Sequence, residues 1–220
     1  PGIEISTDVP DGEVHILGYF IDCQDQELQE TLLRLKKSRL EKAQAMVSKL
    51  SELGIHIDWG RVQEFVQGDS VGRPHIAEAM LEKGYITSIR EAFTKYIGYG
   101  GPAYVKRERI IPAEAVALVA RVGGVPVLAH PRDIDDLDGF IDGLKGAGLM
   151  GLEVYYDGYL TREVERLEDV ARRHGLIPSG GSDYHGLSDH GMTARKNCSK
   201  PQNSIERLIS LAGPREDVVL

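Results

Sequence analysis

The 220-residue sequence predicts an α/β protein that carries a helical insert. Three observations lead to this prediction. Short apolar runs bounded by turns, typical of β-strands, occupy residues 1–22 and recur between residues 124 and 180. In the second region they alternate with helical patterns, the spacing of βα units in a parallel sheet or barrel. Residues 26 to about 100 show helical patterns and little strand signal, which indicates a small helical domain inserted between the two.

The N-terminal segment predicts two strands and then a long helix. Two β runs, Gly2–Ile5 and Val14–Ile21, are joined by a Pro-Asp-Gly turn, so we expect a hairpin or adjacent strands. A charged helix is predicted from Gln26 to Leu53, because apolar residues recur at spacings of three to five. Gly54 ends it, as glycine commonly does at helix C-termini. The apolar stripe comprises Leu28, Leu32, Leu35, Leu40, Ala43, Val47 and Leu50.

The remaining elements follow from the same patterns. The insert is expected to contain three short helices and a loop: Trp59–Val66, Pro74–Lys83, Ile89–Tyr96 and Gly98–Pro102. The C-terminal part is expected to contain helices at Pro112–Val122, Ile134–Ala147, Thr161–His174 and Asn203–Leu211, and strands at Gly124–Ala129, Gly151–Tyr155 and Leu176–Gly180. The predicted domains are therefore residues 1–25 with 101–220, and residues 26–100.

Composition excludes several classes of partner. Lys and Arg number 26 against 34 Asp and Glu, a net charge of −8, which argues against long duplex nucleic acid. The two cysteines, Cys23 and Cys198, form no C-x-x-C pair, so a cysteine zinc site or disulfide framework is not expected. No apolar run reaches the length of a membrane span, and the first residues do not form a signal peptide. We expect a cytoplasmic protein; the sequence leaves its oligomeric state open.

Candidate metal ligands lie on or just after the predicted strands. In parallel α/β proteins, functional groups gather at the C-terminal ends of strands. The ligand types are imidazole and carboxylate without thiolate, which suits Mn²⁺, Fe²⁺ or Zn²⁺. Asp183 and His185, two positions apart, could address neighbouring metals, the usual arrangement for phosphoester hydrolysis. The candidate ligands are Glu4, His15, His130, Asp183 and His185.

Each candidate also has a structural interpretation. A single histidine at a strand end is more often hydrogen-bonded structure than ligand, and Asp183 alone could cap a helix. The combination on successive elements favours metal binding. His56 and His174 are interpreted as structural. Glu153 has a weaker case as a ligand, and we expect it to support other ligands or the fold.

The insert contains a candidate phosphate site. Arg73 and His75 precede and open a predicted helix, where free N–H groups favour an anion. Arginine offers a planar fork for phosphate, although both residues could equally be structural. Lys106 belongs to a short basic stretch with Arg107 and Arg109; taken one by one, these residues favour a solvated linker. Arg73, His75 and Lys106 are the substrate-binding candidates.

Several motifs, in order along nearly the whole chain, resemble the PHP (polymerase and histidinol phosphatase) family of metal-dependent phosphoesterases. They are Gly-Ile-Glu-Ile-Ser, Val-His-Ile-Leu-Gly-Tyr, Gly-Arg-Pro-His-Ile-Ala, Leu-Ala-His-Pro and Gly-Ser-Asp-Tyr-His-Gly. The insert is similar to that of the branch acting on 3′,5′-nucleoside bisphosphates and short RNA.

The resemblance implies a distorted (βα)₇ barrel with two or three divalent metals at its mouth and the helical insert as a cap. Mn²⁺ is the first choice of metal, with Fe²⁺, Zn²⁺ or Mg²⁺ as alternatives. It further implies that Glu4, His15, His130, Asp183 and His185 are metal ligands, with Asp183 and His185 catalytic. Arg73 and His75 would then face the substrate phosphate.

The family pattern is incomplete here. The family begins with a His-x-His strand and further ligands that this sequence lacks, and His190 cannot replace them. The chain also opens in mid-strand without an initiator methionine. We therefore expect a barrel that lacks its N-terminal part, from either a fragment of a longer protein or a degenerate relative, and we favour the fragment because the remaining motifs are intact.

The expected activity of the complete protein is hydrolysis of a nucleotide phosphomonoester. The substrate implied is a 3′,5′-nucleoside bisphosphate, which would lose its 3′-phosphate, with 5′→3′ trimming of short RNA as a related activity. The alternatives are a phosphatase of the histidinol-phosphate type or another small molecule, and an inactive metal-binding fragment.

Overall fold

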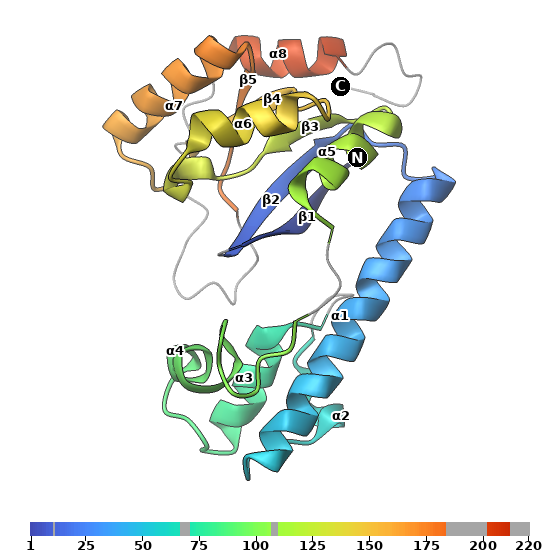
Figure 1. Cartoon of the computed structure of the whole chain (residues 1–220), viewed down its shortest axis with the longest axis vertical. Helices are drawn as coiled ribbons and strands as arrows, with labels where there is room; N and C mark the ends of the chain where they lie inside the picture. Colours follow the sequence, from blue (N-terminus) through green and yellow to red (C-terminus); the bar gives the residue numbers. More distant parts are fainter. Residues whose placement is uncertain (11, 67–70, 107–109, 184–201, 212–220) are drawn as a thin grey trace. The chain divides into compact units, whose positions relative to one another are not determined.

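The computed structural model describes residues 1–10, 12–66, 71–106, 110–183 and 202–211 (Figure 1). The chain divides into two compact units. Unit 1 comprises Pro1–Leu28 with Ile110–Leu220, and unit 2 comprises Gln29–Arg109. The division thus falls after residues 28 and 109, where the sequence placed it after residues 25 and 100.

Unit 1 is built on a five-stranded mixed sheet. β2 pairs antiparallel with β1 and with β3, whereas β3, β4 and β5 are parallel. Within the described residues the strands form an open row. The sheet and the helices that follow its strands confirm the predicted α/β class. The predicted hairpin and the parallel βα region are both present. In sheet order the strands are β1 (Gly2–Val9), β2 (Gly12–Tyr19), β3 (Val125–Leu128), β4 (Gly151–Tyr156) and β5 (Ile177–Gly181).

The helices of unit 1 follow the strands as the pattern predicted. Their bounds are α5 (Pro112–Arg121), α6 (Leu137–Lys145), α7 (Thr161–His174) and α8 (Gln202–Leu211), with a 3₁₀ turn η2 at Pro131–Asp133. α6 begins three residues later than predicted, because the Asp136 side chain accepts the Gly139 N–H at 3.1 Å and caps the helix there. α7 has its predicted bounds. Glu163 accepts the Leu160 N–H, and Gly175 ends the helix in the left-handed conformation.

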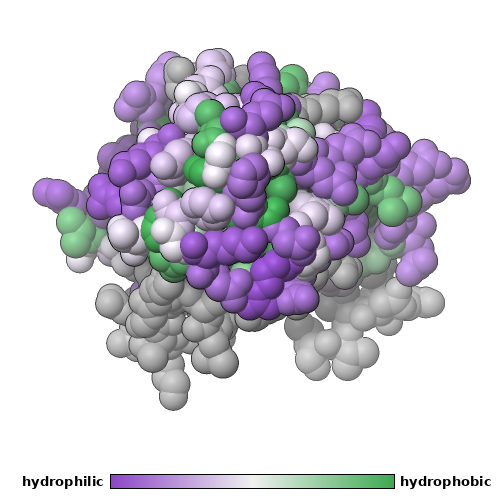
Figure 2. Space-filling view, turned by 90° about the horizontal axis from the view of Figure 1, so that it is seen from below, coloured by the Kyte–Doolittle hydropathy of each residue, from purple (hydrophilic) through white to green (hydrophobic). Residues whose placement is uncertain are grey.

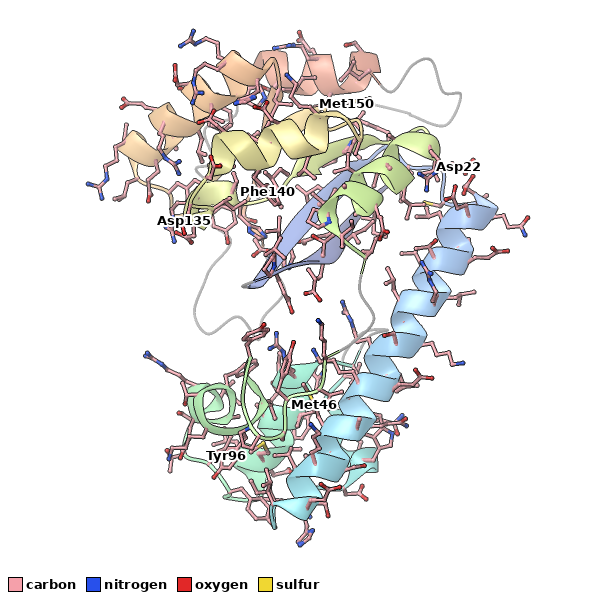
Figure 3. The ribbon with its side chains drawn as sticks, in the orientation of Figure 1. Asp22, Met46, Tyr96, Asp135, Phe140 and Met150 are labelled. Atoms are coloured by element: carbon pink, nitrogen blue, oxygen red, sulfur yellow. The ribbon has the colours of Figure 1, made fainter. Side chains whose placement is uncertain are left out.

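Unit 2 is helical, with one correction to its predicted core. Its elements are α1 (Gln26–Glu52, whose first turn lies in unit 1), α2 (Trp59–Glu64), α3 (Arg73–Glu82), α4 (Ile89–Ala92) and a π-helix η1 (Phe93–Ile97). Met46 lies on the side of α1 that faces the shorter helices and is fully buried (Figure 3). Leu40, predicted on the apolar stripe, is 39% exposed. Within unit 2 the stripe therefore packs through the C-terminal half of α1, where Ala43 and Leu50 are also buried; Leu28, in the first turn, is buried in unit 1.

Figure 2 shows the distribution of hydrophobic residues on one face of the molecule. On the face shown in Figure 2, hydrophobic residues form small patches separated by hydrophilic ones. Among the helices of the described ranges, none has both the length and the hydropathy needed to cross a membrane.

Candidate metal centre

The β1–β2 hairpin places two candidate ligands on one face of the sheet. Side chains alternate between faces along a strand, and Ile5 and Ile16 are buried on the opposite face. Glu4 is paired with Leu17, and His15 with Ser6. Glu4 and His15 are thus diagonal neighbours on the same face, close enough for long side chains to meet.

His130 joins them from the C-terminal end of β3. Its Nε2 lies 3.0 Å from His15 Nδ1 and 3.7 Å from Glu4 Oε1. His15 Nδ1 in turn lies 2.7 Å from Glu4 Oε1. Within the described ranges, this is the group of His, Cys, Asp and Glu side chains that could hold a metal ion. The structure therefore brings together three of the five ligands predicted from the sequence.

The three donor atoms fit a divalent metal ion. Ligand atoms at ~2.1 Å from one tetrahedral metal lie about 3.4 Å from each other. The observed separations of 2.7, 3.0 and 3.7 Å lie on both sides of that value. Two imidazoles and one carboxylate are also a donor set suited to Mn²⁺, Fe²⁺ or Zn²⁺ rather than Ca²⁺.

Electrostatics keep the carboxylate charged. The imidazoles of His130 and His15 hold the pKa of Glu4 well below its usual range, against the opposing effect of burial. Glu4 in turn raises the pKa of His130, with Glu153 and Asp183 adding to this effect. Negative charge thus accumulates around the two imidazoles, as a cation site requires.

Glu153 contacts the backbone of a candidate ligand, in line with the supporting role expected from the sequence. It lies on β4, is only 4% exposed, and its Oε2 accepts the backbone N–H of His130 at 2.8 Å. Burial raises the pKa of its carboxyl. The β4–β5 register shifts between Glu153 and Tyr155, a bulge of the kind often found beside active sites. The signal in the sequence is a carboxylate inside the apolar run of a parallel strand, where hydrophobic residues are the rule.

Asp183 lies after β5 and extends the same region. Its Oδ2 accepts a hydrogen bond from the Tyr156 hydroxyl at 3.2 Å, and the Tyr156 ring meets that of His130 edge-on at 6.0 Å. Both His130 and Asp183 have positive φ values, +28° and +50°. Such conformations are uncommon for residues other than glycine and concentrate at functional sites. Tyr156 was not predicted as a site residue.

The remaining candidates lie either outside the described residues or in unit 2. His185, with His190, Arg107 and Arg109, lies outside the described residues. Arg73, His75 and Lys106 belong to unit 2. His75 Nδ1 accepts the Gly72 N–H at 2.9 Å, so its Nε2 carries the proton when the ring is neutral. The Arg73 guanidinium lies 5.5 Å from the centre of the Phe93 ring.

Comparison with known proteins identifies the family. No protein-family profile matches the chain. A phosphoribosyl 1,2-cyclic phosphate 1,2-diphosphodiesterase from Eggerthella lenta is 30% identical over 193 residues, which cover 84% of this chain and 72% of the relative. The chain belongs to the PHP family of metal-dependent phosphoesterases.

Other similar proteins are also named as enzymes that cleave phosphate esters. A 3′,5′-nucleoside bisphosphate phosphatase from Chromobacterium violaceum is 29% identical over 86% of this chain and 68% of its own length. The 5′-3′ exoribonuclease Rnm from Escherichia coli is 31% identical over 84% of this chain and 64% of its own length. The chain therefore spans about two thirds of these relatives. The crystal structure of a protein classed as a metal-dependent phosphoesterase from Bifidobacterium adolescentis superposes with a TM-score of 0.81 at 28% identity, over 96% of this chain and 75% of that one.

Proposed function

We propose that the protein hydrolyses a phosphate ester of a nucleotide with the help of divalent metal ions. The convergence of Glu4, His15 and His130 from three neighbouring strands carries this proposal. The substrate proposed is a 3′,5′-nucleoside bisphosphate, which loses its 3′-phosphate, with 5′→3′ removal of nucleotides from short RNA as a related activity. The names of the C. violaceum and E. coli relatives support this substrate class.

Glu4, His15 and His130 would hold the metal, with Asp183 and His185 completing a site for two or three ions. Mn²⁺ is the first choice, and Fe²⁺, Zn²⁺ or Mg²⁺ are alternatives. When bound, such ions lower the pKa of water and neutralise phosphoryl oxygens. We further propose that the sheet of unit 1 belongs to a distorted (βα)₇ barrel, that unit 2 is its cap, and that the protein is cytoplasmic.

The protein side chains would fix the geometry of the reaction. Glu4 presents its Oε1 to both histidines, so one carboxylate orients two imidazoles. Tyr156 holds Asp183 through its hydroxyl. Arg73, His75 and Lys106 are proposed to bind a substrate phosphate: the first and last through positive charge, and His75 through its Nε2–H.

A second candidate is hydrolysis of a cyclic phosphodiester on a sugar. The E. lenta relative, of which the chain covers the largest share among the three, carries that activity in its name. In both reactions water attacks a phosphoryl group, a step that bound metal ions would assist. The Glu4–His15–His130 cluster is therefore compatible with either reaction.

The test is phosphate and product release by the full-length protein, stripped with chelator and then supplied with Mn²⁺. The substrates are 3′,5′-bisphosphoadenosine, a 5′-phosphorylated RNA pentamer, phosphoribosyl 1,2-cyclic phosphate and histidinol phosphate. Mn²⁺-dependent turnover fastest on the bisphosphate supports the proposal. Preference for the cyclic phosphate selects the second candidate, and preference for histidinol phosphate selects a phosphatase of that type. Turnover of none of the four would overturn all of these activities.

A further inference from the structure

His130 occupies an unusual backbone position for a candidate ligand. Its φ and ψ are +28° and +58°, in or near the left-handed region that residues with a Cβ rarely adopt. A residue keeps such a conformation only when its surroundings hold it there. His130 has no glycine-like freedom, so other groups must fix its backbone.

The Glu153 carboxylate supplies one such group. Its Oε2 accepts the His130 N–H at 2.8 Å, and the Glu153 side chain is almost completely buried on the neighbouring strand. The Ala129 N–H just before it donates to the His15 carbonyl at 3.0 Å. The peptide groups entering His130 are therefore fixed from both neighbouring strands, β2 and β4.

Gly181 on β5 leaves the space that this carboxylate needs. A Cβ at Gly181 would lie 2.8 Å from Glu153 Oε1, closer than atoms in van der Waals contact can approach. No left-handed φ requires glycine at this position, so the missing side chain is explained by the room it leaves for the carboxylate. Gly181 comes two residues before Asp183, in the same strand-end segment.

We infer that Glu153 is a positioning residue, which fixes the His130 backbone so that the imidazole meets His15 and Glu4, and that Gly181 is required to accommodate it. This inference rests on the proposed metal site. Partners that orient metal ligands without touching the metal typically contribute 10–100-fold to metal affinity. Glu153 acts as a hydrogen-bond acceptor here, so an uncharged acceptor of the same shape should replace it.

The test compares four variants of the full-length protein by calorimetric titration with Mn²⁺. Glu153→Ala removes the acceptor, and we expect its Mn²⁺ affinity to fall 10–100-fold. Gly181→Ala crowds the carboxylate and should weaken binding in the same direction. Glu153→Gln retains a carbonyl acceptor and should stay within a few-fold of the wild type. Ser179→Ala is the matched control: Ser179 is also buried and pairs with Glu153 across the sheet, but the His130 N–H donates to Glu153 rather than to Ser179, so Mn²⁺ binding should not change.

A second readout needs no metal. Hydrogen exchange of the His130 amide, measured by NMR on metal-free protein, should be slower in the wild type and Ser179→Ala than in Glu153→Ala. If the wild type binds no Mn²⁺, the proposed metal site fails, and this exchange rate alone decides the positioning role.

Two outcomes overturn the inference. One is a folded Glu153→Ala protein with wild-type Mn²⁺ affinity and wild-type exchange at His130. The other is a Glu153→Gln protein as weak as Glu153→Ala, which would make the negative charge of Glu153, rather than its role as an acceptor, the important property. Gly181→Ala keeps the test decisive if Glu153→Ala does not fold.

Discussion

His130 Nε2 lies 3.0 Å from His15 Nδ1, although 115 positions separate these residues in the sequence. The contact exists because β2 and β3 are antiparallel neighbours, with Ile16 opposite Leu128. No sequence motif around either histidine indicates that the two side chains lie close together. The candidate metal centre is therefore a product of strand order, and damage to the sheet would remove it as surely as loss of a ligand.

Replacing His15 should abolish the metal site without unfolding the protein. His15→Ala removes the ring closest to Glu4, so we expect Mn²⁺ affinity and Mn²⁺-dependent turnover to fall by at least about 100-fold. Elemental analysis after desalting measures the bound metal. His56→Ala is the control, because His56 is an exposed histidine bonded to Ser51 in unit 2. Wild-type metal content in His15→Ala would contradict the assignment.

Removing a phosphate-binding side chain should affect substrate affinity more than turnover. If Arg73 binds the substrate phosphate, Arg73→Ala should raise KM about tenfold with a smaller change in kcat. Arg90→Ala, an exposed arginine of α4 in the same unit, should change neither. Steady-state kinetics on the preferred substrate make the comparison. Equal KM values for the two variants would argue against a role for Arg73.

The core of unit 2 should be sensitive at Met46 and tolerant elsewhere on the same helix. Met46 is fully buried in α1, so Met46→Ala should lower the free energy of unfolding by about 2–5 kcal/mol. Leu33, also in α1, is 65% exposed. Leu33→Ala should therefore change the free energy of unfolding by less than about 0.5 kcal/mol. Urea unfolding followed by circular dichroism gives both values. A similar loss for both would mean that α1 packs differently.

Gly98 should not accept a side chain. A Cβ there would overlap the carbonyl oxygen of Phe93, to which the Gly98 N–H donates at 3.0 Å, so the end of η1 would have to shift. Gly98→Ala should therefore destabilise the protein by about 1–3 kcal/mol. Gly146→Ala, where a Cβ meets open space, should be neutral or stabilising by up to about 1 kcal/mol. The melting temperatures of the two variants should shift from the wild-type value in opposite directions, or by clearly different amounts.

One ion-pair network should make stability depend on acid pH. Arg173 and then His174 lower the pKa of Asp138 from 3.8 to about 2. A carboxyl whose pKa is lower in the folded state stabilises the fold above its unfolded pKa, and this contribution is lost as the pH falls toward the folded value. Asp138→Asn should therefore lower the urea midpoint at pH 6, and its difference from the wild type should shrink between pH 4 and pH 2. Glu165→Gln, which removes an exposed carboxylate from α7, is measured in parallel as the control.

Local signals explain which elements the sequence predicted well. The helix at 161–174 has a capping glutamate at one end and a glycine at the other, so both bounds were predictable. The predicted start of α6 was wrong because the Asp136 side chain caps the helix there, although the spacing of apolar residues continues further toward the N-terminus. At the site, histidines and a glutamate on or just after strands made Glu4, His15 and His130 candidates, and the structure places these three side chains together. The roles of Glu153 and Gly181 depend on contacts across β3, β4 and β5, which no local pattern contains.

The position of unit 2 in the chain has a consequence for folding. Its residues lie between β2 and β3, so the pairing of these strands closes a very long loop, whereas the β1–β2 hairpin is local. Non-local pairing is slow because loop-closure entropy is lost before contacts form. Glu4 and His15 can thus meet early in folding, while His130 arrives only when the two halves of unit 1 join. Tight metal binding would then form only at the last step of folding. In a refolding experiment with Mn²⁺, metal binding should therefore appear later than the recovery of the helical signal.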